Sequence, residues 1–413
     1  MKATGHRRAL LRDPAEGART AFKHAFGHAP THCVRVPARV ELLGSHAEWN
    51  DGLALTAAVD RYLCLASAPR LDGRVELVSS AYPQREMFWL SEFAENPHVP
   101  WTALVKAMLA RLRARGVHFG GFNAAVHSEI PPGSGFGSSG ALLAATALTV
   151  RQLYPHKLTE TGAIVRRLGR EKMPAPTKLE RLRLARLCQQ AATGVAAEAG
   201  GHWDAVTSLC AEEFSAVLAD AQQGTVESVP LHGEAALVVC DTGRLHPIVE
   251  ARSAALRFHC AAAAKVLGVT TLRVVEPAQL KSARHRLTAR QHACAYHVVG
   301  ENQRVVAAER ALRKGDLAQF GQYLFQSHAS AREFFQNSAP ELDWLVERAG
   351  EHPACLGARL SGQGFGGFTV NLVLWQEAAE FCQRLETEFR RTQGRELRTW
   401  RCRVVAGATV RSA

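Results

Sequence analysis

Glycine and serine are concentrated at positions 131–141, between two segments with a regular hydrophobic pattern. Apolar and polar side chains alternate from Phe122 to Ile130, which predicts a half-buried strand. The run from Leu142 to Tyr154 contains no Gly or Pro and predicts a helix. Glycines let the backbone turn tightly and approach a ligand, and the N–H groups at the start of a helix favour an anion. We therefore predict a phosphate-binding loop that contains Gly133, Ser134, Gly135, Gly137, Ser138 and Ser139.

A plainer interpretation of the same loop is a tight turn whose serine caps the following helix. The loop is not a Walker A motif, because no Lys follows Gly140.

Two other stretches place polar residues beside glycines. Residues 34–52 form a β-branched, apolar run that ends at Gly44 and continues as SHAEWNDG, which predicts a strand leading into a turn. Residues 360–370 carry four glycines and then enter another strand-like run.

The length and composition are those of an ordinary globular protein. With 413 residues, 47% hydrophobic and 21% charged, the chain can bury a large core, and we predict two domains, residues 1–208 and 209–413. The formal net charge is +12, but 38 acidic residues lie among the basic ones. No recognition motif or clustered basic and aromatic patch accompanies this charge, so we expect no nucleic-acid partner. The basic character also suits phosphorylated small molecules.

The cysteines and the hydropathy pattern indicate a cytoplasmic protein. Ten cysteines are spread along the chain without a CxxC pair, which is typical of reduced, partly buried thiols and disfavours a metal cluster. No uninterrupted apolar run approaches the length needed to cross a bilayer, so we expect no membrane partner. The sequence does not indicate an oligomeric state.

The three polar, glycine-containing stretches occur in the order found in the GHMP kinases. Residues 35–61, RVPARVELLGSHAEWNDGLALTAAVDR, resemble the galactokinase signature, in which a strand with an Arg leads into Gly-Glu-His-Thr-Asp-Tyr-Asn. Residues 131–141 resemble the second GHMP motif and residues 360–370 the third. The similarity extends from about Phe22 to Val405. It implies an α+β fold of two domains, the two-domain GHMP kinase fold, with nucleotide and sugar in the cleft between them.

The resemblance also implies a reaction, in which ATP phosphorylates the anomeric hydroxyl of galactose or a related sugar. Such a transfer needs a phosphate cradle, a divalent metal, a cation and a group that orients the acceptor hydroxyl. By resemblance, ATP binds the 133–139 loop, Arg39 lies near the transferring phosphate and Asp204 orients the hydroxyl and takes its proton. Ser139 would reach Mg²⁺. The sugar-binding residues implied are Ser45, His46, Glu48, Gly364, Gly366 and Gly367.

Several positions depart from the family pattern. Ser45 stands where the pattern has Glu, and Glu48 stands where it has Asp. Ala192 replaces the Glu that helps hold Mg²⁺ in galactokinases. Asp204, a lone acid in a Gly-rich stretch, has a second interpretation as a helix cap. These departures keep an alternative open, a catalytically impaired relative that acts as a nucleotide or sugar sensor or as an interaction protein.

A further stretch resembles the family outside the three motifs. Residues 293–335 are similar to the corresponding galactokinase region and predict further helices. We interpret His297, Glu301 and His328 in this stretch as packing or capping groups rather than ligands.

Overall fold

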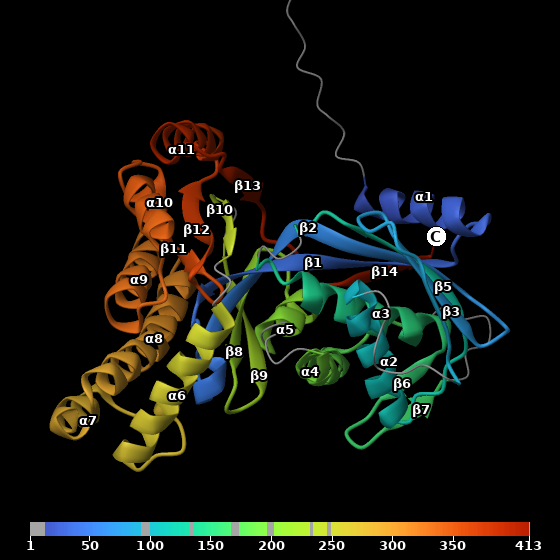
Figure 1. Ribbon diagram of the computed structural model, residues 1–413, viewed down its shortest axis with the longest axis horizontal. Helices are drawn as coiled ribbons and strands as arrows, with labels where there is room; N and C mark the ends of the chain where they lie inside the picture. Colours follow the sequence, from blue (N-terminus) through green and yellow to red (C-terminus); the bar gives the residue numbers. More distant parts are fainter. Residues whose placement is uncertain are drawn as a thin grey trace, which may run out of the picture.

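The computed structural model describes residues 13–91, 100–131, 135–166, 173–195, 202–231, 234–245 and 249–412. Figure 1 shows two lobes, one in blue and green that is built around a long sheet, and one in yellow to red that is rich in helices. The helices are α1 Pro14–Phe26, α2 Ala103–Ala114, α3 Ser138–Leu153, α4 Lys178–Val195, α5 His202–Cys210, α6 Val249–Leu267, α7 Pro277–Ser282, α8 Ala289–Arg313, α9 Leu317–Ser330, α10 Pro340–Gly350 and α11 Ala378–Gln393. The strands are β1 His32–Leu43, β2 Leu53–Pro69, β3 Arg74–Ser79, β4 Glu86–Trp89, β5 Phe122–Ser128, β6 His156–Leu158, β7 Ala163–Val165, β8 Ser215–Asp220, β9 Thr225–Pro230, β10 Ala235–Leu245, β11 Cys355–Ser361, β12 Gly366–Leu374, β13 Arg398–Cys402 and β14 Thr409–Ser412.

The first lobe is organised by β1 and β2, which pair antiparallel over most of their length. The strand order is β14-β1-β2-β5-β3-β4, with β8 paired to β2 and β9 to β8. β3 and β5 are parallel neighbours, while the other pairs in this sheet are antiparallel. Helices α2 to α5 lie on one face and α1 lies on the other (Figure 1). Because β14 pairs with β1, the end of the chain returns to the first lobe.

Helix α3 is the centre of this lobe. It contacts β1, β2, α2, α4 and α5, and all its residues from Gly140 to Arg151 are buried. Its sequence is apolar on every side, SSGALLAATALTVRQL, which is the pattern of a helix enclosed by other elements. The predicted strand before the glycine loop is confirmed as β5, and the predicted helix after it is confirmed as α3.

The second lobe contains a four-stranded antiparallel sheet in the order β11-β12-β10-β13. Its apolar cluster includes buried side chains of α10 and α11 packed against β10 and β12. Helix α9 packs on β11 and on α8, and α6 packs on α8. The predicted domain boundary after residue 208 stays a prediction. In the hydrogen-bonded sheets, β8 and β9 join the first sheet, and the four-stranded sheet begins with β10.

Within the described residues, no helix combines the length and the apolar character required to span a bilayer.

A buried ion pair between Arg151 and Glu180 joins α3 to α4. Arg151 donates from Nε to Glu180 Oε1 at 2.9 Å and from Nη2 to Oε2 at 3.0 Å. Its Nη1 donates to the carbonyl of Pro174 at 2.9 Å. Both charged side chains are almost fully enclosed, so each charge depends on the other for its stabilisation.

We expect Glu180→Gln to lower the free energy of unfolding by about 3 kcal/mol, because the Arg151 guanidinium would stay buried without its counter-charge. Urea denaturation measures this loss. Glu396→Gln is the matched control, since Glu396 also makes a two-pronged contact with an arginine, Arg390, but at an exposed site. Water screens that pair, and its loss should leave stability unchanged. Equal effects of the two substitutions would contradict this account.

Candidate active site

Two distant segments bring an arginine and an aspartate together beneath the glycine loop. Arg39 lies on β1 and Asp204 lies in the first turn of α5. Arg39 donates from Nε to Asp204 Oδ1 at 2.5 Å, and its Nη2 contacts the same oxygen. Only 7% of Arg39 and 4% of Asp204 is exposed. Burial opposes the charge on Arg39, but Asp204 and Glu41 outweigh it and raise the pKa of Arg39.

The glycine loop lies directly on this ion pair. A Cβ at Gly137, where φ is +79°, would come within 2.9 Å of Arg39 Cγ, and one at Gly140 within 2.5 Å of Asp204 Cβ. The backbone N–H of Arg39 also donates to the carbonyl of Phe136 at 2.9 Å. Glycine is therefore required at both positions for the loop to approach so closely.

The serines of the predicted loop begin α3. Ser138 and Ser139 are half-buried at the first two positions of the helix, where free backbone N–H groups favour an anion. Gly135 is exposed with φ of +80°, and a Cβ at this position would lie 2.8 Å from the ring of Phe368 in the second lobe. Gly133 and Ser134 lie outside the described residues.

The turn after β1 carries the predicted sugar-binding residues and is buried. Arg359 Nη2 donates to Ser45 Oγ at 2.5 Å. His46 Nε2 lies 3.0 Å from Asn337 Nδ2, and its ring packs against Trp49 and Phe335. Burial, reinforced by the charge of Arg359, lowers the pKa of His46 to about 3, so the imidazole is neutral at ordinary pH.

Glu48 begins a short 3-10 turn, Glu48–Asn50, and is half-buried. Burial and the nearby Glu41 raise the pKa of Glu48 to about 7. Glu41 and Glu48 therefore lie close enough together that a negative charge on one opposes ionisation of the other.

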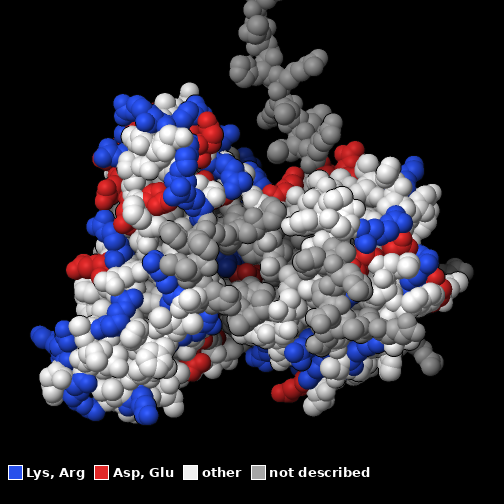
Figure 2. Space-filling model, in the orientation of Figure 1, with Lys and Arg blue, Asp and Glu red and all other residues white. Residues whose placement is uncertain are grey.

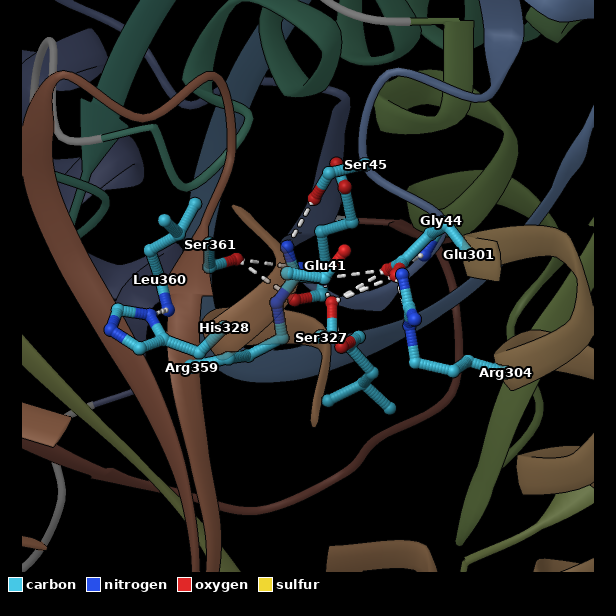
Figure 3. Close-up of polar contacts among 12 residues, drawn as sticks. Glu41, Gly44, Ser45, Glu301, Arg304, Ser327, His328, Arg359, Leu360 and Ser361 are labelled. Atoms are coloured by element: carbon cyan, nitrogen blue, oxygen red, sulfur yellow. Dashed lines mark hydrogen bonds and ion pairs between the residues drawn. The ribbon is translucent and has the colours of Figure 1, made fainter. Parts of the chain in front are cut away.

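A buried polar network holds the turn from the second lobe (Figure 3). Glu301 on α8 accepts from the backbone N–H of Gly44 at 3.0 Å, from Ser327 Oγ at 2.8 Å and from Arg304 Nε at 2.7 Å. Burial alone would raise the pKa of Glu301, but Arg304 and Arg359 hold it well below its usual range. The interpretation of Glu301 as a structural group agrees with these contacts.

The third predicted motif closes the site from the second lobe. Gly364, Gly366 and Gly367 adopt φ angles of +81°, +119° and +89°. A Cβ at Gly364 would come within 2.1 Å of the carbonyl oxygen of Asn337, the residue that contacts His46. The three motifs predicted from the sequence therefore meet in space, and Figure 2 shows the surface hollowed between the two lobes.

The position of the expected metal ligand is apolar. Ala192 on α4 is 2% exposed and belongs to the main hydrophobic cluster. Among the described residues, no group of three His, Cys, Asp or Glu side chains is placed to hold a metal ion. The Ser139 hydroxyl fits a metal bound mainly by phosphate oxygens and water, which is the usual mode of Mg²⁺.

The sequence interpretation missed three residues of the site. Arg359 is fully buried and donates to the carbonyl of Leu42 at 3.0 Å as well as to Ser45. Asn337 joins His46 to the third motif, and Glu41 lies beside Arg39 on β1. Only Glu41 had a usable signal, since a residue two positions from Arg39 on a strand shares its face.

Comparison with known proteins agrees with this arrangement. Family models match at residues 20–69 (galactokinase galactose-binding signature), 103–212 (GHMP kinases N terminal domain) and 308–390 (GHMP kinases C terminal). The galactokinase of Chloroflexus aurantiacus is 32% identical over 394 residues, covering 94% of this chain and 96% of that protein. The chain belongs to the galactokinase family. Human galactokinase is 34% identical over 364 residues, covering 86% of this chain and 87% of that protein.

Two solved structures have the same fold. The Lactococcus lactis galactokinase complexed with galactose has a TM-score of 0.83 at 23% identity, covering 95% of this chain and 98% of that one. The Methanococcus jannaschii mevalonate kinase has a TM-score of 0.60 at 15% identity, covering 90% of this chain and 98% of that one. The predicted membership in the galactokinase group and the predicted α+β GHMP kinase fold are confirmed.

The neutral, buried His46 predicts a loss of stability in acid. Between pH 6.5 and 3 the unfolded chain binds a proton at this side chain and the folded chain does not, so the folded state loses about 1.4 kcal/mol per pH unit as pH falls. His46→Gln should remove this component. In urea denaturation at several pH values, the stability of the wild type relative to the variant should fall as pH falls.

The exposed His24 supplies the control, and His24→Gln should leave the pH dependence of the wild type unchanged. Parallel stability curves for the wild type and His46→Gln would mean that His46 is protonated in the folded protein.

Proposed function

We propose that this protein is an ATP-dependent sugar kinase that transfers the γ-phosphoryl group of ATP to the anomeric hydroxyl of galactose or a related sugar. One observation carries the proposal. The Arg39–Asp204 pair lies buried beneath a glycine loop at the start of a helix, and the Arg39 Nη1 atom is buried there without a hydrogen-bond partner. An unpartnered buried donor is costly, and a phosphoryl oxygen would satisfy it.

The nucleotide phosphates lie against the loop from Gly133 to Ser139. The backbone N–H groups of the loop and of the first turn of α3 bind the phosphate oxygens. Arg39 Nη1 donates to the transferring phosphoryl group and stabilises the charge that develops there. Arg39 also fixes Asp204, whose Oδ1 accepts two contacts from its guanidinium.

Asp204 orients the acceptor hydroxyl and takes its proton. The sugar oxygen forms a bond to the γ-phosphorus, the bond from this phosphorus to the β–γ bridging oxygen breaks, and ADP leaves with that electron pair. Asp204 lies where α5 begins, at the side of the ion pair that the glycine loop covers. A positioned carboxylate at this place both aligns the hydroxyl and removes its proton.

The sugar binds at the turn after β1. Ser45, His46 and Glu48 supply its polar contacts, and the glycines of the third motif, Gly364, Gly366 and Gly367, allow the backbone to approach the sugar and the phosphate. The fixed positions of Ser45 and His46, held by Arg359 and Asn337, support this assignment.

Mg²⁺ accompanies ATP in this proposal, and Ser139 would hold it. When bound, Mg²⁺ would supply positive charge that offsets the negative charge of the phosphates. Because Ala192 offers no carboxylate, the remaining ligands would be phosphate oxygens and water.

The alternative of an inactive relative rests on Ser45 and Ala192, and the intact Arg39–Asp204 pair favours the enzyme. The phosphate-binding and proton-accepting parts of the site keep their positions despite those two departures. We further propose that the enzyme acts in the cytoplasm, where its ten free cysteines stay reduced.

We expect Asp204→Asn to lower the turnover of sugar roughly 10²–10⁴-fold, because the variant loses the group that accepts the hydroxyl proton. ATP affinity measured by calorimetry should change little. Asp241→Asn is the control, since Asp241 is a buried acid bound to an arginine, Arg398, at 2.6 Å in the second sheet. It should keep wild-type turnover. Wild-type turnover in Asp204→Asn would exclude Asp204 from the reaction.

Removal of the Ser139 hydroxyl should weaken the response to Mg²⁺. In Ser139→Ala, we expect the Mg²⁺ concentration for half-maximal turnover to rise about 10-fold, which corresponds to the loss of one charge-assisted contact. Ser138→Ala changes the neighbouring, equally half-buried serine and should leave the Mg²⁺ requirement unchanged. Equal Mg²⁺ curves for the Ser139 variant and the wild type would reassign the metal site.

A further inference from the structure

Glu41 is a buried acid of the site to which the proposed mechanism gives no role. It lies two residues after Arg39 on β1, and its side chain therefore faces the same side of the strand. Ser361 fixes its backbone, because Ser361 Oγ accepts from the Glu41 N–H at 3.1 Å and donates to the Glu41 carbonyl at 2.9 Å. The residue is 6% exposed. Its backbone is held by both lobes.

The carboxylate of Glu41 is only half satisfied. The neighbouring Ser45 hydroxyl lowers the pKa of Glu41 and so favours its charged form, while Oε1 is buried without a partner. Ser45 in turn accepts from Arg359 at 2.5 Å (Figure 3). A buried acceptor without a donor costs free energy, and a hydrogen bond from a ligand would recover it.

The surroundings of Glu41 lie within the proposed active site. Burial raises the pKa of Glu41, while Arg39 and Arg359 oppose that shift and Asp204 reinforces it. Glu41 is also the charged group that most raises the pKa of Glu48. Its carboxylate is thus in electrostatic contact with both members of the catalytic pair and with the sugar-binding turn.

A hydroxyl group is a suitable hydrogen-bond partner for Glu41 Oε1. Oε1 is a buried oxygen that accepts no hydrogen bond, so an occupant that donates one satisfies it. A sugar hydroxyl donates to a carboxylate without bringing a second charge into the buried site.

We propose that Glu41 binds one hydroxyl of the acceptor sugar through Oε1 and so determines which sugars the enzyme accepts, an inference that rests on the proposed function. The galactokinase pattern has a carboxylate at position 45, where this chain has Ser45. Glu41 supplies a carboxylate from the neighbouring strand, and Ser45 and Arg359, which are hydrogen-bonded to each other, both favour its charged form. The carboxylate is relocated from the turn to the strand rather than lost.

The test combines the substitution Glu41→Gln with the removal of single hydroxyl groups from the sugar. Wild type and Glu41→Gln are compared on the best substrate of a sugar panel and on each of its monodeoxy analogues, with steady-state kinetics and with calorimetry of sugar binding. The variant keeps the size of the side chain but turns an N–H₂ group or a weaker acceptor toward the sugar. We expect its KM and Kd for the parent sugar to rise about 10- to 100-fold, the effect of losing a hydrogen bond to a charged group.

The decisive result is whether the loss of sugar affinity caused by removing a hydroxyl group depends on the side chain at position 41. One deoxy analogue should bind the wild type at least about 10-fold more weakly than the parent sugar, and this penalty should nearly vanish in Glu41→Gln. Penalties for the other analogues should be the same in both proteins. Glu76→Gln is the control, because Glu76 is a buried acid on β3, away from the site, and is bound to Arg85.

Two outcomes would overturn the proposal. If Glu41→Gln lowers kcat while every deoxy penalty stays at its wild-type value, Glu41 acts only by positioning Arg39. If sugar KM and Kd are unchanged, Oε1 does not face the sugar. Both outcomes leave the proposed function standing. A wild-type protein that binds and phosphorylates no sugar of the panel would instead refute the proposed function together with this inference.

Discussion

The buried ion pair between Arg39 and Asp204 is the interaction on which the site depends. Removing two charges from water is costly, and the pair repays this only when geometry and additional contacts are good. Here the pair joins β1 to α5, and the glycine loop covers it at positions where a Cβ would collide with either side chain. One fixed arginine therefore sets the position of the loop, the strand and the acid at the same time, and its remaining Nη1 is left for a ligand.

The turn after β1 belongs to the first lobe but is held from the second. Arg359 donates to Leu42 and Ser45, Ser361 brackets Glu41, and Glu301 accepts from Gly44. These contacts run from the end of β1 to β11 and α8, so the turn takes its shape only where both lobes are present (Figure 3). The geometry of the site is thus a property of the assembled fold, because neither lobe alone satisfies the polar groups of this turn.

Buried acids in this protein differ in how many hydrogen bonds their carboxylates accept. Glu301 receives donors from Gly44, Ser327 and Arg304, and its pKa is held low despite burial. Glu41 and Glu48 receive fewer contacts, and burial raises the pKa of each. A fully bonded carboxylate stabilises the fold, whereas one with an unsatisfied oxygen beside the Arg39–Asp204 pair keeps capacity for a hydrogen-bond donor.

The sequence by itself determined the family, the fold and the three motifs. Gly and Ser spacing, the period of the strand before the loop and the apolar run after it are local properties, and they identified β5, the loop and α3. Only the tertiary structure decided which polar residues from distant segments meet. Arg359 and Asn337 come from strand and loop positions without a local signal, and 314 residues separate Arg359 from Ser45. The surroundings of Glu41 likewise depend on Ser361 and Arg359 of the second lobe, because hydrogen bonding across the two lobes is not encoded in any single segment.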